Sequence, residues 1–190
     1  MTRIIAGAAG SLALAVPDAG TRPTSDRVRE SLFGALESGD HVRGAAVLDL
    51  YAGSGALGLE AISRGAASAD LVERAPRAAS VVERNVRAVS RAVPTARVRV
   101  HRAAVDAFLR SATGDYDLVF VDPPYDLDAA SLATTLALLA PRLSAEAVVV
   151  VERATRSGEP AIPAGLDLAR EKKYGDTTLW WLRRAEELDG

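Results

Sequence analysis

Residues 118–125 read Leu118-Val119-Phe120-Val121-Asp122-Pro123-Pro124-Tyr125, and this stretch decides which fold the chain can adopt. An apolar run of this kind is typical of a strand buried on both faces inside a parallel α/β sheet. The two prolines end the strand, because neither can donate a hydrogen bond to a neighbouring strand. Ligands bind at the carboxyl ends of parallel strands in open α/β sheets. We therefore predict a stiff binding edge at residues 122–125.

The groups at this edge suit a flat substrate that carries an amino group. Pro123 restricts the residue before it to extended geometry, which directs the Asp122 carboxylate out of the strand end. A carboxylate and a backbone carbonyl can accept both hydrogens of the amine, while Tyr125 stacks on the ring plane. Asp122, Pro123, Pro124 and Tyr125 are therefore the predicted catalytic residues. In the simpler alternative the prolines only stop a strand and the tyrosine only packs in the core, but the flanking acid and ring favour a site.

Length and composition indicate one globular domain. The 190 residues suffice for an α/β domain with a proper core, and 48% of them are hydrophobic and 25% charged. The absence of cysteine excludes disulfides, thiolate metal sites and cysteine nucleophiles. With only His41 and His101 as imidazoles, we predict no metal site.

The charge is unevenly distributed along the chain. The net charge is -2, yet residues 74–110 hold nine arginines against two acids. A locally positive region fits contact with nucleic-acid phosphates, although a solvated arginine-rich helix and strand explains it equally well.

No apolar run approaches the length of a membrane span, about 18 residues. Residues 1–16 imitate a secretory signal, but Gly7 and Gly10 interrupt them and we predict that they belong to the fold.

Alternating strand and helix patterns predict parallel strands with helices on both faces of the sheet. The expected strands are 46–51, 69–73, 98–101, 116–121 and 147–151. One helix is expected to begin at Thr24 or Ser25 and another to end near residue 64. Further helices are expected over 76–93, 105–110 and 129–140. Segments 4–5 and 12–16 are expected to form a small first hairpin, and 166–173 with 177–182 a closing hairpin. In the latter we expect one of Trp180 and Trp181 to face inward and the other partly outward.

A glycine-rich turn follows the first long strand. Residues 49–58 read Asp-Leu-Tyr-Ala-Gly-Ser-Gly-Ala-Leu-Gly, with the glycine spacing of a nucleotide-binding turn. Glu73 ends the next strand 24 residues after Asp49, where an acid can hold both hydroxyls of an adenosine ribose. Asp49 could bind an ammonium group, which favours S-adenosylmethionine (SAM). A NAD site fits less well, because no hydride-transfer constellation follows.

Taken together, the chain resembles the bacterial 16S rRNA (guanine-N2)-methyltransferases of the D type, within the class I SAM-dependent fold. The resemblance covers nearly the whole chain, and its most specific piece is residues 22–33, Arg-Pro-Thr-Ser-Asp-Arg-Val-Arg-Glu-Ser-Leu-Phe. Residues 49–60, 119–125 and 171–173 (Glu-Lys-Lys) fit as well. The resemblance implies a Rossmann-like sheet of seven mostly parallel strands with an antiparallel C-terminal hairpin. It also implies a β-hairpin extension over residues 1–22 and a methyltransferase domain over 23–190.

The resemblance also implies roles for individual residues. Cofactor-binding residues are expected to be Asp49, Tyr51, Gly53, Ser54, Gly55, Glu73, Arg74, Ala104 and Val105. Asp122 to Tyr125 are expected to hold the guanine, and Thr24, Arg27 and Tyr125 to bind the substrate. Two departures from the family stand out. Ser11 to Leu14 of the first hairpin are uncharged where relatives tend to be basic, and Ala103 to Val105 leave adenine recognition to the backbone near Ala104 or to Asp106.

The implied activity is SAM-dependent methylation of the exocyclic N2 of one guanine in 16S rRNA. The expected partner is the assembled small ribosomal subunit, rRNA with its proteins, and the expected enzyme is a cytoplasmic monomer. A DNA adenine-N6 or cytosine-N4 methyltransferase is the alternative, since such enzymes use similar Asp-Pro-Pro-Tyr edges. No separate target-recognition segment is visible in 190 residues, which disfavours it. A third possibility is an RNA-binding or assembly module without turnover.

Overall fold

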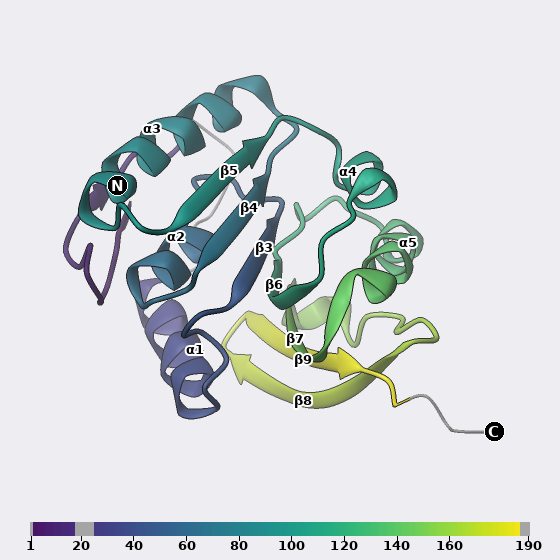
Figure 1. Cartoon of the computed structure of the whole chain (residues 1–190). Helices are drawn as coiled ribbons and strands as arrows, with labels where there is room; N and C mark the ends of the chain where they lie inside the picture. The colour runs from purple at the N-terminus through teal and green to yellow at the C-terminus, as the bar shows by residue number, and fades with distance from the viewer. Residues whose placement is uncertain (1, 18–24, 187–190) are drawn as a thin grey trace.

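The computed structural model describes residues 2–17 and 25–186, which form a seven-stranded sheet and a separate two-stranded hairpin. The sheet runs in the order β5-β4-β3-β6-β7-β9-β8 (Figure 1). Its strands are β3 (Ala46–Leu50), β4 (Ser68–Val72), β5 (Arg97–His101), β6 (Tyr116–Val121), β7 (Leu143–Ala154), β8 (Leu166–Tyr174) and β9 (Thr177–Arg184). Strands β3 to β7 pair in parallel, whereas β9 is antiparallel to both β7 and β8. The predicted mostly parallel sheet with a closing antiparallel hairpin is confirmed.

Helices cover both faces of the sheet, as Figure 1 shows. The helices are α1 (Asp26–Ser38), α2 (Ala56–Ser63), α3 (Pro76–Ala92), α4 (Val105–Ser111) and α5 (Ala129–Leu139), with short 3-10 turns at η1 (Ala140–Arg142) and η2 (Thr155–Ser157). Side chains of α1, α2 and α3 pack in one core, and those of α4 and α5 in a second. Residues of β6 alternate between them, Phe120 in the first core and Val121 in the second. Among the described residues, no helix is long and apolar enough to cross a membrane.

Local sequence signals set the helix starts. Ser25 caps α1, its Oγ accepting from the Val28 amide at 3.3 Å, and Asp128 caps α5 by accepting from the Ser131 amide at 2.8 Å. Pro76 occupies the first turn of α3, where its missing N–H costs nothing.

Two local expectations are corrected by the sheet. Strand β7 runs for 12 residues, longer than the expected 147–151, because Leu143 pairs with Tyr116 of β6 near one end and β9 pairs as far as Ala154 at the other. Trp180 and Trp181 are both buried, not one partly outward, since β9 lies inside the sheet with a core on each face.

The small N-terminal hairpin is confirmed, and only its first strand begins earlier than expected. Strand β1 (Thr2–Arg3) pairs antiparallel with β2 (Ala13–Leu14), which lies within the expected 12–16, and the Ile4 amide extends the pairing by donating to the Leu12 carbonyl at 2.9 Å. The Ile5 amide donates to a carboxylate of α2 and so leaves the ladder. The side chains of Ile4 and Leu14 join the first core. The expected division into 1–22 and 23–190 falls in residues 18–24, outside the described residues, and stays a prediction.

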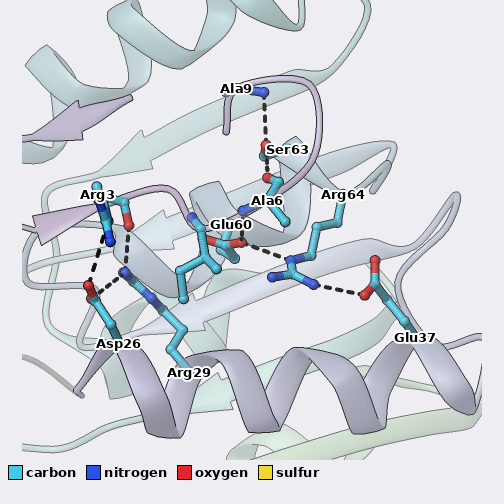
Figure 2. Close-up of polar contacts among 10 residues, drawn as sticks. Arg3, Ala6, Ala9, Asp26, Arg29, Glu37, Glu60, Ser63 and Arg64 are labelled. Carbon is cyan, nitrogen blue, oxygen red and sulfur yellow. Dashed lines mark hydrogen bonds and ion pairs between the residues drawn. The ribbon is translucent and has the colours of Figure 1, made fainter. Parts of the chain in front are cut away.

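A buried carboxylate attaches this hairpin to the sheet domain (Figure 2). Glu60 of α2 is completely buried and accepts from the amides of Ile5 at 2.7 Å and Ala6 at 3.0 Å. It also accepts from Nε of Arg64 at 2.8 Å. Burying a charge requires such partners, so the hairpin and α2 are expected to stay together.

A buried arginine ties the same hairpin to α1. Arg29, almost fully buried, donates to the Arg3 carbonyl and to the Asp26 carboxylate (Figure 2). The hairpin is therefore held by charged side chains of two helices, one acidic and one basic.

Replacing Glu60 with alanine is expected to lower the free energy of unfolding by about 3–5 kcal/mol, because two amides and a buried arginine would lose their acceptor. Urea denaturation measures this loss. Glu37→Ala is the control, since Glu37 pairs with Arg64 from a side chain that is 47% exposed and should contribute less than about 1 kcal/mol. Equal losses in the two variants would contradict the anchoring role of Glu60.

Candidate active site

A cavity of about 920 Å³ opens at the carboxyl ends of the central strands. The strand order reverses between β3 and β6, which is the switch point where open α/β sheets bind ligands. Among the residues predicted from the sequence, those lining the cavity are Asp49, Tyr51, Gly53, Ser54, Glu73, Arg74, Ala104, Val105, Asp122, Pro123, Pro124 and Tyr125. Segments that lie far apart in the sequence therefore share one site.

Two predicted residues, Gly55 and Arg27, are not part of the cavity lining, and a third lies outside the described residues. Gly55 is buried at the start of α2 with φ of 78°, so it shapes the turn without lining the cavity. Arg27 is exposed on α1 and is not part of the lining. Thr24 lies outside the described residues, and its expected role in substrate binding stays a prediction.

Glu73 closes the glycine turn. Its Oε2 accepts from the Gly53 amide at 3.0 Å, and its Oε1 accepts from the Ala75 amide at 2.8 Å. A carboxylate oxygen has two lone pairs, so each oxygen keeps one for a ligand hydroxyl. Gly53 has φ of 59°, a backbone conformation that glycine adopts at little cost.

Asn85 of α3 holds the opposite side of this turn. It is buried and donates through Nδ2 to the Ser54 carbonyl at 2.8 Å. The same amide group bonds the backbone of Ala15 in both directions, at 2.9 Å each. Because Val16 and Pro17 line the cavity, Asn85 positions both the glycine turn and the end of the hairpin on its wall.

Asp49 lies deeper, on β3, with only 1% of its surface exposed. Its Oδ2 accepts from the Gly58 amide at 2.9 Å, and a Cβ at residue 58 would collide with the Leu71 side chain. Burial raises the pKa of Asp49 to about 7, and the charge of Glu73 adds to the rise while the Gly58 amide opposes it. The ionised carboxylate would therefore gain from a cationic ligand.

Asp122 is half-buried where β6 ends, beside further acids. Burial raises its pKa well above the ordinary value, and the charges of Glu152 and Asp49 raise it further. Tyr125, at the far end of the Asp-Pro-Pro-Tyr edge, is 66% exposed. The edge thus joins a carboxyl group inside the cavity to an aromatic ring at its mouth.

The cavity also contains residues that sequence reasoning missed, among them Arg29, Glu152, Arg153 and Thr135. For one of them, Glu152, the sequence does contain a local pattern that indicates a site. Glu152 directly follows the apolar run Ala147 to Val151, in the position that Asp122 holds after Val121. The others lie on helices or rims, where no local pattern marks them.

A hydrogen-bonded chain supports the wall near the expected adenine position. Tyr51 follows β3 with φ of 61°, which is uncommon for a residue with a side chain. Its hydroxyl lies 3.2 Å from Oγ1 of Thr135, which donates to Asp106 at 2.7 Å. Asp106, which the sequence offered as an alternative to the backbone near Ala104, thus lines the cavity with one oxygen already bonded.

The acceptors and acids of this cavity suit SAM. Its ribose hydroxyls match the remaining lone pairs of Glu73, and its positive charges match the acids of the cavity wall. Within residues 2–17 and 25–186, no three His, Cys, Asp or Glu side chains form a group that could hold a metal ion.

The fold and the cavity define the class I methyltransferase architecture. The solved structure of yhhF from Escherichia coli matches this chain with a TM-score of 0.83 at 36% identity, covering 96% of this chain and 97% of that one. A more distant structure shares the fold alone: magnesium protoporphyrin IX methyltransferase from Synechocystis PCC 6803, with bound SAM, has a TM-score of 0.65 at 13% identity, covering 87% of each chain.

Sequence comparison narrows this class to a family. The family described as conserved hypothetical protein 95 matches residues 2–183. Ribosomal RNA small subunit methyltransferase D of Escherichia coli (strain K12) is 39% identical over 176 residues, covering 91% of this chain and 85% of that protein. The chain belongs to this family of methyltransferases.

The buried Asp49 is expected to make stability pH-dependent. Its pKa is 3.8 in the unfolded chain and about 7 in the folded one, so folding retains a proton between these values. The contribution of Asp49 to stability is full below about pH 4 and falls by up to about 1.4 kcal/mol per pH unit as the pH rises towards 7. Urea denaturation of the wild type and of Asp49→Asn across this range should show their difference changing with this slope. A difference in unfolding free energy that stays constant with pH would contradict the raised pKa of Asp49. Asp115→Asn, which removes the charge of an exposed acid, is the control for surface charge.

Proposed function

We propose that this chain uses SAM to methylate the exocyclic N2 of a guanine in small-subunit rRNA, and that it acts on the assembled small ribosomal subunit. The observation that carries the proposal is the Asp-Pro-Pro-Tyr edge on the wall of the cavity that also holds the glycine turn and Glu73. The name of the Escherichia coli relative supports rRNA as the substrate class.

Each part of the cavity has a task in this proposal. Bound SAM supplies a methyl group carried on a positively charged sulfur. Glu73 would hold the ribose hydroxyls, Asp49 the ammonium group, and the backbone at Ala104 and Val105 the adenine. The acids of the wall favour a cationic cofactor over its neutral product, which assists release after transfer.

Asp122 would position the amine of the target base. Its carboxylate and the Pro123 carbonyl accept the amine hydrogens, and the raised pKa of Asp122 suits it to take up the proton that the amine loses. Tyr125 is exposed at the cavity mouth, where it can stack on a base turned out of the RNA. Alignment is the main requirement, because the methyl group is already activated.

An arginine-rich surface on one edge supports contact with RNA. Strand β5 is an edge strand, and helix α3 lies in the crossover that leads to it. The exposed arginines of these two elements are Arg77, Arg84, Arg87, Arg91, Arg97 and Arg99. This surface is small relative to a ribosomal particle, so the proteins of the subunit would help to present the base.

Transfer of labelled methyl from SAM tests the proposal. We expect label in N2-methylguanosine after incubation with unmethylated small subunits and digestion to nucleosides, with less on naked rRNA and none on duplex DNA. Asp122→Asn should lower kcat at least about 100-fold, because the amine loses its charged acceptor. Asp115→Asn, just before the same strand, should leave kcat unchanged. Label only in DNA would favour the adenine or cytosine alternative, and none despite SAM binding would favour a module without turnover.

Salt dependence tests the arginine surface. Arg87→Ala and Arg97→Ala should each weaken binding to small subunits, and each should reduce the slope of log Kd against log salt by about 1 if its arginine neutralises one phosphate. Methyl transfer at saturating subunits should be unchanged. Arg43→Ala, exposed in the loop before β3, serves as the control. Unchanged slopes for both arginines would exclude this surface from the interface with RNA.

A further inference from the structure

Two strand ends on the cavity wall carry acids side by side. Strands β6 and β7 pair in parallel with Val121 opposite Val151. Asp122 and Glu152 are the next residues, and both line the cavity. Neighbouring strands lie about 4.8 Å apart, so the two side chains start from adjacent positions.

Both acids lie on the same face of the sheet. Val121 and Val151 pack in the second core, between the sheet and helices α4 and α5. Because side chains alternate along a strand, Asp122 and Glu152, one residue later, are expected on the opposite face, where α1 packs in the first core. Their closeness has an electrostatic consequence, since the charge of Glu152 raises the pKa of Asp122.

A pair of carboxylates selects for adjacent hydrogen-bond donors. An ionised carboxylate only accepts hydrogen bonds. Guanine presents its N2 amine next to a ring N1–H, which are two neighbouring donors. Adenine and cytosine present their amines next to a ring nitrogen that is itself an acceptor, and a second carboxylate would repel its lone pair. Enzymes that act on a base turned out of the helix read this same edge.

We propose that Glu152 accepts a hydrogen bond from the ring N1–H of the target base and thereby selects guanine. This inference rests on the proposed function and deepens it. Asp122 holds the amine that is methylated, and Glu152 reads the neighbouring ring position. Glu152 is thus a specificity-determining residue for the base.

The test changes the ring position and keeps the amine. Small-subunit rRNA is assembled by ligation with guanine, 2,6-diaminopurine or 2-aminopurine at the position that the wild type methylates, then reconstituted with the ribosomal proteins. Both analogues keep the 2-amino group but carry an acceptor at N1. They differ from each other at position 6, so an effect common to both is assigned to N1.

The wild type is expected to methylate guanine with a kcat/KM roughly 10- to 100-fold above that for either analogue. Glu152→Gln offers an amide N–H to the ring acceptor, so the preference should shift towards the analogues by a similar factor. Glu152→Asp keeps the carboxylate and should keep the preference for guanine. Glu146→Gln makes the same substitution at an exposed position near the other end of β7 and should leave the ratio at the wild-type value.

Two results would overturn the inference while leaving the proposed function intact. One is a wild type that methylates guanine and the analogues equally well. The other is Glu152→Gln lowering kcat/KM for all three bases by the same factor, which would make Glu152 a purely structural residue. A wild type that fails to methylate guanine in the particle is a different outcome, and it overturns the proposed function itself.

Discussion

The parallel pairing of β3 with β6 is the constraint on which the rest of the structure depends. From β3 the chain moves outward through β4 to β5, then returns to β6 and continues to β7 on the other side. The crossovers therefore diverge at the centre of the sheet, and a cavity opens there. Since Leu50 lies opposite Val121, the glycine turn after β3 and the Asp-Pro-Pro-Tyr edge after β6 must face one another. No local feature of either segment produces this.

The same pairing gathers acids at a cost to stability. Asp49, Glu73, Asp122 and Glu152 lie at or near the ends of four adjacent strands, and burial raises the pKa of Asp49 and Asp122. Without a ligand the ionised carboxylates repel one another, whereas a cationic ligand relieves this repulsion. Strain and like charge commonly gather at functional sites because the surrounding fold holds them in place.

The N-terminal hairpin is part of the wall because α2 carries both its attachment and the glycine turn. Helix α2 begins directly after Gly55, and further along it Glu60 accepts from the Ile5 and Ala6 amides. Ser63, in its last turn, donates to the Ala6 carbonyl and accepts from the Ala9 amide. A shift of the hairpin would thus disturb the helix that starts at the glycine turn. The uncharged loop of this hairpin fits such a structural task.

The sequence by itself determined the element types and the strand-end residues. The run before Asp122, the glycine spacing after Asp49 and the proline at position 76 are local signals, and local geometry follows from them. Tertiary structure alone decided that Arg29 is buried while Arg27 is exposed, that both Trp180 and Trp181 are buried, and that Glu152 stands beside Asp122. The physical reason is that burial of a charge and adjacency of strand ends depend on partners from distant segments, which no local pattern encodes.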